Sequence, residues 1–256
     1  MNRLKQYAAF LLLAALPCMV ACSDDEGPAM PSDEIVQVDF YKSGGDSFTI
    51  QARYKFTYDA KSRVTGVRTD YLRQEVSFTY GASTIAYRWE GMNADSTLFI
   101  NRFEADLKNG RVNVMRSDRG NYTYFYNAQG YLSDVSFAAN KSLSYKWNKS
   151  ALLIESDPTT YETEYNYSTV LNDYSIDLNV LPQLIDAREE FALVLNSYGQ
   201  LAEVLGQRYP YFLEDTDYSY RYHYDENDRL VQIEMTPAGL VPGKQETYWV
   251  MLTYAD

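Results

Sequence analysis

The stretch Tyr218-Ser219-Tyr220-Arg221-Tyr222-His223-Tyr224 decides the expected fold, because an aromatic residue occupies every second position. Successive side chains of a strand point to opposite faces of a sheet, so strict alternation predicts an antiparallel strand with one buried and one exposed face. The same alternation recurs at residues 54–58, 76–80, 122–124, 145–147 and 161–167. The sequence therefore predicts an all-β protein.

A recurrent turn motif connects these strands. An Asp or Asn opens each turn, because its side chain accepts hydrogen bonds from backbone N–H groups two residues further on. Gly130 and Gly199 supply a left-handed residue at the end of the turn, a conformation that Asp228 tolerates and Ser62 adopts less readily. The copies span residues 58–64, 126–132, 195–201 and 224–230, with a shorter variant at 107–112.

The hairpins repeat at a nearly constant spacing. Aromatic strand ends recur at Tyr58, Tyr80, Phe103, Tyr126 and Trp147, in steps of 21 to 23 residues, which is the length of one hairpin. We expect residues 35–256 to form a single antiparallel meander of repeated hairpins that closes or curls into a large barrel-like sheet. Residues 178–192 interrupt the pattern and leave open a short helix or an ordered loop.

The first 21 residues have the pattern of a signal peptide. Arg3 and Lys5 precede an apolar run over residues 8–16, which is shorter than the roughly 20 residues that span a bilayer. The run leads to Met19-Val20-Ala21-Cys22, which resembles the lipobox of bacterial lipoproteins. The resemblance implies cleavage before Cys22 and lipid attachment to its sulfur. Cys18 fits less well, because Pro17 stands where a small residue is needed. An ordinary secreted protein is the alternative.

Residues 22–34 are expected to form a flexible acidic linker. Gly27, Pro28 and Pro31 accompany the acidic run 23–26, and no strand pattern is present. The acidic run also resembles the signal that follows the lipidated Cys in surface-exposed Bacteroidetes lipoproteins. A solvated tether is the alternative interpretation.

The turn motif carries a second resemblance. Its Tyr-Asp-x-x-Gly-Arg-Leu style is similar to the YD repeats of Rhs-type shell proteins. Together with the lipobox, it makes residues 35–256 resemble an uncharacterised Bacteroidetes lipoprotein family, a domain of unknown function with a porin-like β fold. This resemblance implies a lipid-anchored outer-membrane protein, at the cell surface or on the periplasmic face, and brings no catalytic residues.

Composition excludes several classes of function. The chain of 256 residues has 23 Lys and Arg, 35 Asp and Glu and one His, for a net charge of −12. Removing residues 1–21 takes away Arg3 and Lys5 and leaves 21 basic against 35 acidic side chains, or −14. This acidity argues against binding nucleic acid or an anionic membrane surface, and one His excludes sites with two or three His ligands. We expect neither a metal nor another cofactor.

The distribution of aromatic residues along the strands indicates whether the sheet spans a membrane. Transmembrane barrels gather aromatic residues in two girdles, whereas here they recur along whole strands. The sequence therefore favours a sheet surrounded by water.

Two clusters are candidates for a reactive or a metal site. Ser219, His223 and Asp225 share one face of a strand, but parallel side chains do not converge as a catalytic triad does, and no nucleophile elbow is present. The acidic residues of 214–228 match no EF-hand spacing, so we expect solvated turns rather than calcium ligands. They are Glu214, Asp215, Asp217, Asp225, Glu226 and Asp228.

The three tryptophans allow two interpretations. Trp89, Trp147 and Trp249 all lie in strand-like runs, which favours packing in the core over a platform that stacks on sugars.

The leading hypothesis is a non-enzymatic, lipid-anchored envelope protein that binds or scaffolds a glycan or protein partner outside the cell. A glycan-binding accessory lipoprotein of a polysaccharide-uptake system is the first alternative. A hydrolase with an unrecognised carboxylate site is the second.

Overall fold

The computed structural model describes residues 33–44, 47–69, 73–93, 95–118, 120–137, 141–147, 151–156, 161–176, 178, 210–215, 217–238 and 247–255. All of them belong to one compact unit, Ser32–Asp256. The predicted signal peptide 1–21 and residues 22–32 of the predicted linker lie outside the described residues and stay predictions.

The described residues form strands and turns and contain no α-helix. The strands are β1 (Ile35–Gly44), β2 (Ser47–Tyr58), β3 (Val64–Thr69), β4 (Gln74–Tyr80), β5 (Thr84–Met92), β6 (Leu98–Lys108), β7 (Arg111–Ser117), β8 (Gly120–Tyr126), β9 (Leu132–Phe137), β10 (Lys141–Trp147), β11 (Ala151–Ser156), β12 (Tyr161–Leu171), β13 (Tyr211–Asp215), β14 (Tyr218–Tyr224), β15 (Leu230–Pro237) and β16 (Tyr248–Tyr254). Each alternating stretch noted above lies within a strand, which confirms the all-β prediction. Residues 178–192, for which the sequence leaves open a short helix or an ordered loop, lie outside the described residues, apart from Leu178.

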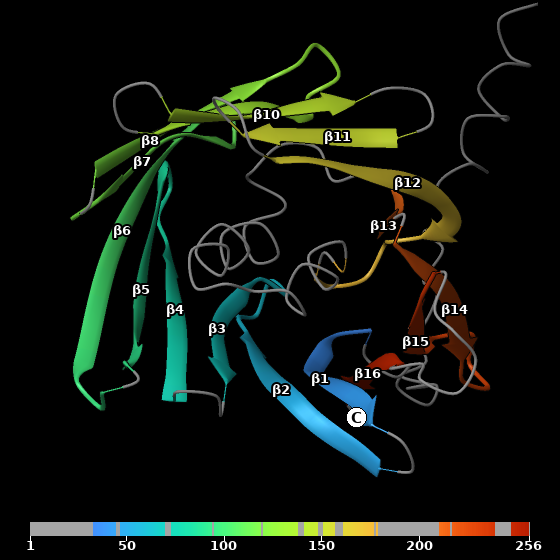
Figure 1. Ribbon diagram of the computed structural model, residues 1–256. Helices are drawn as coiled ribbons and strands as arrows, with labels where there is room; N and C mark the ends of the chain where they lie inside the picture. The colour runs from blue at the N-terminus through green and yellow to red at the C-terminus, as the bar shows by residue number, and fades with distance from the viewer. Residues whose placement is uncertain are drawn as a thin grey trace, which may run out of the picture. The chain divides into compact units, whose positions relative to one another are not determined.

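All sixteen strands belong to one antiparallel sheet. Its order is β13-β12-β11-β10-β9-β8-β7-β6-β5-β4-β3-β2-β1-β16-β15-β14, so the last strand pairs with the first. Figure 1 shows the strands following one another as the sheet curls round. The meander and the curled sheet are thereby confirmed.

The hydrogen-bonded order ends at β13 and β14, which are consecutive in the chain. Their side chains nevertheless touch. The Tyr222 hydroxyl donates to Glu214 Oε1 at 2.8 Å, and the rings of Phe212 and Tyr222 lie 5.1 Å apart between centres. We call this contact, made by Phe212, Glu214 and Tyr222, the seam. The sheet therefore meets itself through side chains at the seam.

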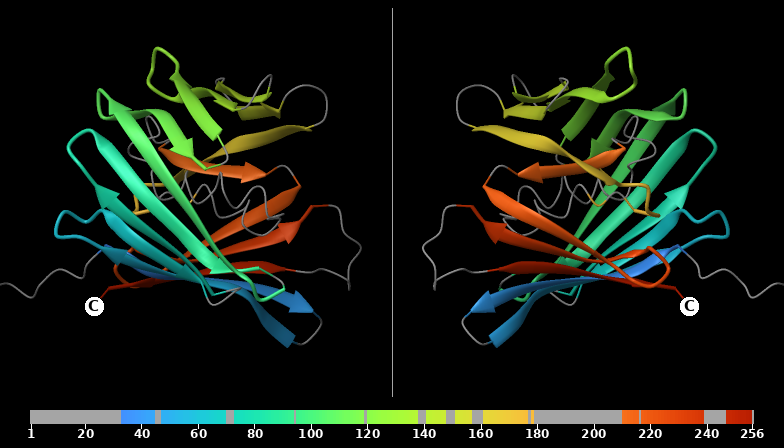
Figure 2. Two further views of the ribbon diagram at one scale, coloured as in Figure 1. Left: turned by 90° about the vertical axis from the view of Figure 1, so that its left-hand side faces the viewer. Right: turned by 90° about the vertical axis from the view of Figure 1, so that its right-hand side faces the viewer.

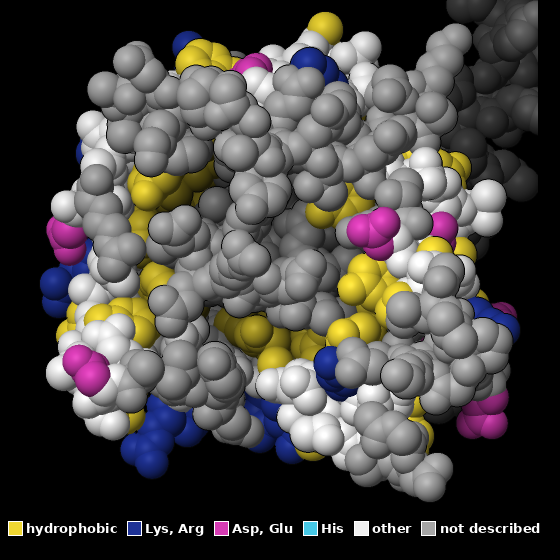
Figure 3. Space-filling view, viewed as in Figure 1, with side chains coloured by type: hydrophobic (Ala, Val, Ile, Leu, Met, Phe, Trp, Pro, Cys, Tyr) yellow, Lys and Arg dark blue, Asp and Glu magenta, His cyan; other side chains and the backbone are white. Residues whose placement is uncertain are grey.

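The sheet turns its apolar face inward. On β5, Ile85, Tyr87 and Trp89 are buried, whereas the alternate residues Ala86 and Arg88 are exposed. The same alternation places Val38 and Phe40, Val76 and Phe78, Ile233 and Met235, and Val250 and Leu252 in the core. In Figure 3, hydrophobic side chains line the inner side of the sheet and charged side chains lie at its periphery. Burial of this face supplies the main favourable free energy of folding.

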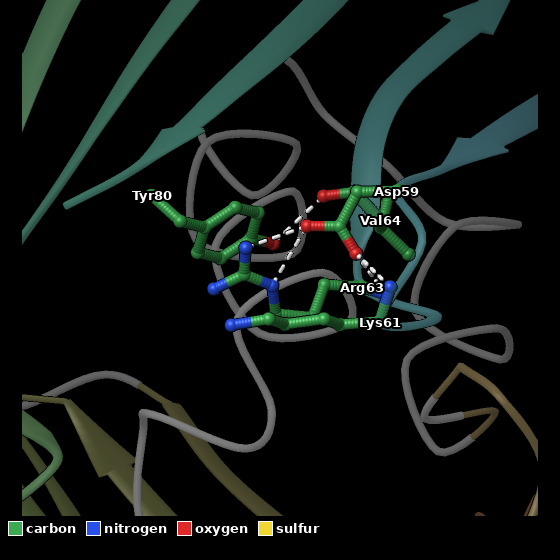
Figure 4. A network of polar contacts seen from close by, with 5 residues as sticks. All are labelled: Asp59, Lys61, Arg63, Val64 and Tyr80. Atoms are coloured by element: carbon green, nitrogen blue, oxygen red, sulfur yellow. Dashed lines mark hydrogen bonds and ion pairs between the residues drawn. The ribbon is translucent and has the colours of Figure 1, made fainter. Parts of the chain in front are cut away.

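The β2–β3 turn shows how the recurrent motif works (Figure 4). Asp59 Oδ1 accepts hydrogen bonds from the backbone N–H groups of Lys61 (2.9 Å) and Arg63 (3.1 Å), while Ser62 adopts a φ of 56°. The Arg63 guanidinium donates to Asp59 Oδ2 through Nε at 2.8 Å and Nη2 at 2.6 Å. Chiefly through the Arg63 side chain, these bonds lower the pKa of Asp59 to about 2. The turn is thus fixed by the carboxylate that opens it.

Two further copies repeat this geometry. Asn127 Oδ1 accepts from the N–H groups of Gln129 and Tyr131, both at 3.0 Å, and Gly130 has a φ of 90°. Asp225 Oδ1 accepts from the N–H groups of Asn227 and Arg229, both at 2.9 Å, and Asp228 has a φ of 59°. The turn prediction is confirmed for these copies, whereas the copy at 195–201 lies outside the described residues.

Aromatic strand ends join neighbouring hairpins at the same edge of the sheet. Tyr80, Tyr126 and Tyr254 donate their hydroxyls to the carbonyls of Val64, Val112 and Leu230, at 2.7 to 2.8 Å. Trp147 Nε1 donates likewise to the carbonyl of Leu132 at 2.7 Å, and Tyr58 OH to that of Ile35 at 2.6 Å. Burial raises the pKa of Tyr58 to about 12, so it remains a donor at neutral pH.

The prediction of an aromatic strand end was wrong for Phe103. It lies in the middle of β6, stacked on Tyr87 with 4.2 Å between ring centres, and the strand continues to Lys108. The strand continues because the turn follows at Asn109 and Gly110, whose φ values are 55° and 76°.

The chain enters and leaves the sheet at the edge that carries these turns and aromatic strand ends, which we call the turn edge. The backbone N–H of Ala255 donates to the carbonyl of Glu34 at 2.9 Å, which ties the end of β16 to the start of β1. Figure 2 shows the C-terminus on the same side as the turns that follow β2, β4 and β6. The β1–β2 hairpin lies at the opposite edge, which we call the hairpin edge.

Candidate binding surface

The outer face of β14, β15, β16, β1 and β2 carries a continuous row of facing residues. Trp249 of β16 pairs with Tyr41 of β1 on one side and with Glu234 of β15 on the other. Beyond these, Ile50 of β2 faces Tyr41 and Arg221 of β14 faces Glu234. Directly opposed residues of an antiparallel pair have Cβ atoms about 5 Å apart, so these side chains are neighbours.

The apolar part of this row forms an exposed cluster near the hairpin edge. The Phe48 ring lies 4.6 Å from that of Trp249, with an angle of 46° between the ring planes. Phe48 is 67% exposed and Ile50 47% exposed, while Tyr41 and Trp249 are half-buried. We call Tyr41, Phe48, Ile50 and Trp249 the outer platform. It is an apolar patch in contact with solvent.

A β-bulge places two of these residues outside. Ala52 pairs with Phe40 and Ile50 with Tyr41, so Gln51 is an extra residue in β2. Without it, Phe48 and Ile50 would continue the inward series of Ala52. Bulges of this kind re-aim side chains and are common beside functional sites. Sequence reasoning missed Phe48 and Ile50 for this reason, because they keep the two-residue period of β2 while the bulge reverses their face.

Polar groups flank the outer platform on the β15 side. Glu234 Oε2 lies 3.5 Å from His223 Nε2, and Glu234 Oε1 lies 3.8 Å from Arg221 Nη1. The His223 and Arg221 side chains are 47% and 77% exposed, whereas that of Glu234 is 22% exposed. A carboxylate acceptor and two donor groups therefore stand beside Trp249.

The next row towards the turn edge contains a second charged pair. Asp39 accepts two hydrogen bonds from Arg53, from Nε and Nη2, both at 2.7 Å, and a third from Gln37 Nε2 at 3.0 Å. Asp39 is buried although it is charged, and such a group needs partners of this kind. The pair holds the planar Arg53 guanidinium against the outer face, two residues along β1 from Tyr41.

The three tryptophans occupy three different environments. Trp89 lies in the core, edge-on to Phe99, and its Nε1 has no hydrogen-bond partner in the described part of the chain. Trp147 is half-buried and stacks on Tyr131. The expectation of core packing was wrong for Trp249, because Val250 and Leu252 take the inward positions of β16 and leave Trp249 outside.

The residues considered for nucleophilic catalysis do not converge. Ser219 pairs with Thr236 and His223 with Gln232, so four residues, or about 13 Å, separate Ser219 from His223 along β14. A nucleophile and its base must lie within about 3 Å. Asp225 binds its own turn through Arg229, and these bonds lower its pKa.

Two of the acidic residues of 214–228 are bound to different partners. Glu214 accepts a hydrogen bond from Tyr222 at the seam, and Asp225 holds the β14–β15 turn. Among the residues that the structure describes, no group of three or more His, Cys, Asp or Glu side chains could hold a metal ion. Cys22, the predicted site of lipid attachment, lies outside the described residues.

Comparison with known proteins supports the fold. No protein-family model and no curated protein matches the sequence. Among solved structures, the chain is similar to a porin-like protein from Bacteroides uniformis, with a TM-score of 0.59, 14% identity, and coverage of 88% of this chain and 99% of the other. It is also similar to a porin-like protein from Bacteroides vulgatus, with a TM-score of 0.51, 12% identity, and coverage of 86% and 98%. The chain therefore has the all-β fold of these porin-like proteins.

Proposed function

We propose that this chain is a non-enzymatic binding or scaffolding protein of the bacterial cell envelope, held at the outer membrane by lipid on Cys22 and facing the outside of the cell. The observation that carries the proposal is the polarity of the curled sheet, which has apolar side chains inside and charged side chains outside. A sheet with this polarity is suited to being surrounded by water, so it needs a separate anchor to stay at a membrane.

The outer face supports this interpretation in detail. Arg88 pairs with Glu90 and Arg116 with Asp106 on neighbouring positions of β5, β6 and β7. A membrane-spanning barrel has the opposite arrangement, with an apolar band outside and polar groups inside. In the part of the chain that the structure describes, no helix is long and apolar enough to cross a membrane.

The course of the chain is compatible with a tether at the turn edge. Glu34, through which a tether from Cys22 continues into the sheet, is bonded to Ala255 at that edge. The outer platform lies towards the hairpin edge. An acyl chain contributes about 0.8 kcal/mol of membrane affinity per buried CH₂, so several chains hold a protein firmly.

The hydrolase hypothesis has weaker support. Glu75 and Glu90 face each other across β4 and β5, but both lie on the outer face and Glu90 pairs with Arg88 at 2.5 Å. Hydrolysis of glycosides requires two carboxyl groups flanking a bound substrate, with one kept protonated by its surroundings. The outer platform, by contrast, favours the glycan-binding alternative.

Lipid anchoring is tested by expressing the full chain and its Cys22→Ala variant in Bacteroides cells. We expect the unchanged chain in the outer-membrane fraction, with an acylated Cys22 at its mature N-terminus by mass spectrometry. The C22A variant should lose the acyl group and leave the membrane fraction. Protease added to intact cells should cleave the unchanged chain if it faces outward.

The matched control is Cys18→Ala, which alters the other cysteine of the same segment. It should leave fractionation and acylation unchanged. Membrane retention of C22A, or an N-terminus without acyl groups in the unchanged chain, would refute the anchor. Protection from protease in intact cells would place the protein on the periplasmic face instead.

A further inference from the structure

We propose that the outer platform binds an extended, neutral oligosaccharide, which stacks on Phe48 and Trp249 and forms hydrogen bonds with Glu234, Arg221 and His223. This inference rests on the proposed role as a binding protein and names its ligand class and its site.

The aromatic rings of the outer platform are exposed to solvent. Phe48 is 67% exposed although it belongs to a strand, and its ring is held against Trp249 at 4.6 Å. Exposed apolar patches with a polar border mark interaction sites. The bulge at Gln51 builds this patch at the cost of two residues that would otherwise extend the core. The rings are therefore presented outward by the backbone itself.

Hydrogen-bonding groups lie beside the aromatic rings. A pyranose ring has apolar C–H faces and a rim of hydroxyls, so it needs a flat apolar surface with hydrogen-bonding groups next to it. Glu234 supplies acceptors and Arg221 supplies donors in the same row of residues as Trp249. His223 adds a donor from two residues further along β14, with its Nε2 3.5 Å from Glu234 Oε2. A hydroxyl both donates and accepts, so it can bind between such groups.

The described charges beside the outer platform occur in pairs of opposite sign. Glu234 stands with Arg221 and His223, and Asp39 with Arg53. In these pairs each guanidinium group is offset by a carboxylate, whereas an anionic lipid, nucleic acid or acidic polysaccharide binds to unpaired basic groups. A neutral ligand fits this balance.

The size and shape of the outer platform suit a small, extended ligand. A stable protein complex buries about 800 Å² on each partner, whereas an aromatic side chain contributes about 150–250 Å² when it is wholly buried. The outer platform comprises four side chains, two of them already half-buried, so it is small for a protein partner. It lies on the outer face of a sheet, which suits a chain of sugars lying across the strands.

The test is calorimetric titration of the full chain, solubilised in detergent, with five neutral hexasaccharides: cellohexaose, laminarihexaose, xylohexaose, mannohexaose and maltohexaose. We expect at least one of them to bind and to change tryptophan fluorescence. Trp249→Ala and Phe48→Ala should each weaken that binding about tenfold or more, because each removes a stacking surface. Glu234→Gln, which keeps an acceptor, should weaken it less than Glu234→Ala.

Phe125→Ala is the matched control. Phe125 is 49% exposed on the outer face of β8, far along the sheet order from β16, and should leave binding unchanged. Circular dichroism and melting curves establish that each variant is folded. Equal weakening by F125A would show non-specific binding and overturn the proposal.

Two other results would also overturn it. One is the absence of binding by all five hexasaccharides to folded protein. The other is a concentration-dependent dimer that F48A and W249A abolish, which would make the outer platform an interface between two copies. Cys22 takes no part in this assay, so a negative binding result would not contradict the proposed lipid anchor. Equally, evidence against the anchor would not change the binding result.

Discussion

The guanidinium of Arg63 lies 4.2 Å from the ring centre of Tyr80, which belongs to the following hairpin. The same relation recurs between Arg229 and Tyr254 at 4.8 Å and, more loosely, between Arg111 and Tyr126 at 5.6 Å. In the Asn127 turn, Tyr131 takes the place of the arginine and stacks on Trp147. Each turn is therefore covered by the aromatic strand end of a neighbouring strand.

This relation predicts that Tyr80→Phe weakens the fold even though it keeps the ring. The variant loses the hydrogen bond from Tyr80 OH to the carbonyl of Val64, at 2.7 Å, and leaves that carbonyl without this donor. We expect the free energy of unfolding to fall by about 0.5–1.5 kcal/mol, measured by urea denaturation. Tyr224→Phe is the control, because Tyr224 also ends a strand and is 46% exposed. An equal loss in both variants would contradict the role of the Tyr80 hydroxyl.

These turns were predictable from sequence because their chemistry is local. The side chain that opens each turn accepts hydrogen bonds from N–H groups two and four residues ahead, as at Asp59, Asn127 and Asp225. Such short-range patterns can be recognised within a few consecutive residues of the sequence. The covering aromatic was visible only as a regular spacing. Its target, a carbonyl 14 to 24 residues away in the chain, depends on the strand register.

The non-local features of the fold could not be predicted from the sequence. The pairing of β1 with β16 joins residues more than 200 positions apart, and no local signal specifies it. The outer platform depends on one extra residue in β2, which shifts the face of Phe48 and Ile50 without changing the pattern of residue types. Periodicity identifies strands, but the register decides which face each residue takes.

Asp59→Asn should make stability less dependent on pH. The lowered pKa of Asp59, about 2 against an ordinary 3.8, means that its ionised form stabilises the folded state. That contribution is complete above the unfolded pKa and is lost as pH falls from about 5 to 2. Asn keeps the acceptor for the turn but loses the charge that Arg63 binds. We therefore expect D59N to be less stable than the unchanged chain at pH 7 and to approach it near pH 2.

The measurement is the urea midpoint at intervals from pH 7 to pH 2. Asn127→Ala is the control, because Asn127 holds an equivalent turn without charge. The loss of stability in N127A, relative to the unchanged chain, should stay constant from pH 7 to pH 2. A constant deficit in D59N as well would show that the Asp59–Arg63 pair contributes nothing through its charge.

Gly130→Ala should be more destabilising than Gly110→Ala. Both glycines have positive φ, 90° and 76°, where a Cβ costs about 1–2 kcal/mol. A Cβ on Gly130 would also lie 2.5 Å from Arg111 Nη2, whereas one on Gly110 would meet nothing within 4 Å. The Arg111 guanidinium, which lies 5.6 Å from the ring centre of Tyr126, would have to shift. We expect the free energy of unfolding, measured by urea denaturation, to fall by about 1 kcal/mol in G110A and by more in G130A. The reverse order would contradict this geometry.

The seam should behave as a coupled pair of side chains. Tyr222 donates to Glu214 at 2.8 Å where β13 and β14 lack a backbone ladder. Tyr222→Phe should lower the free energy of unfolding by about 1.5–3 kcal/mol, the range for a hydrogen bond to a charged group. Glu214→Gln keeps an acceptor and should cost less. In the double variant the two losses should not add, and additivity would mean that the two side chains do not interact.

The pH dependence of the seam has the opposite sign from that of Asp59. Burial, followed by the bond to Glu214, raises the pKa of Tyr222 above its ordinary value of 10. The protonated phenol therefore stabilises the folded state fully below pH 10, and this contribution is lost as pH rises further. The stability difference between the unchanged chain and Y222F should stay constant from pH 6 to 9 and shrink above pH 10. A difference that persists undiminished at pH 11 to 12 would show that the Tyr222 proton does not stabilise the seam.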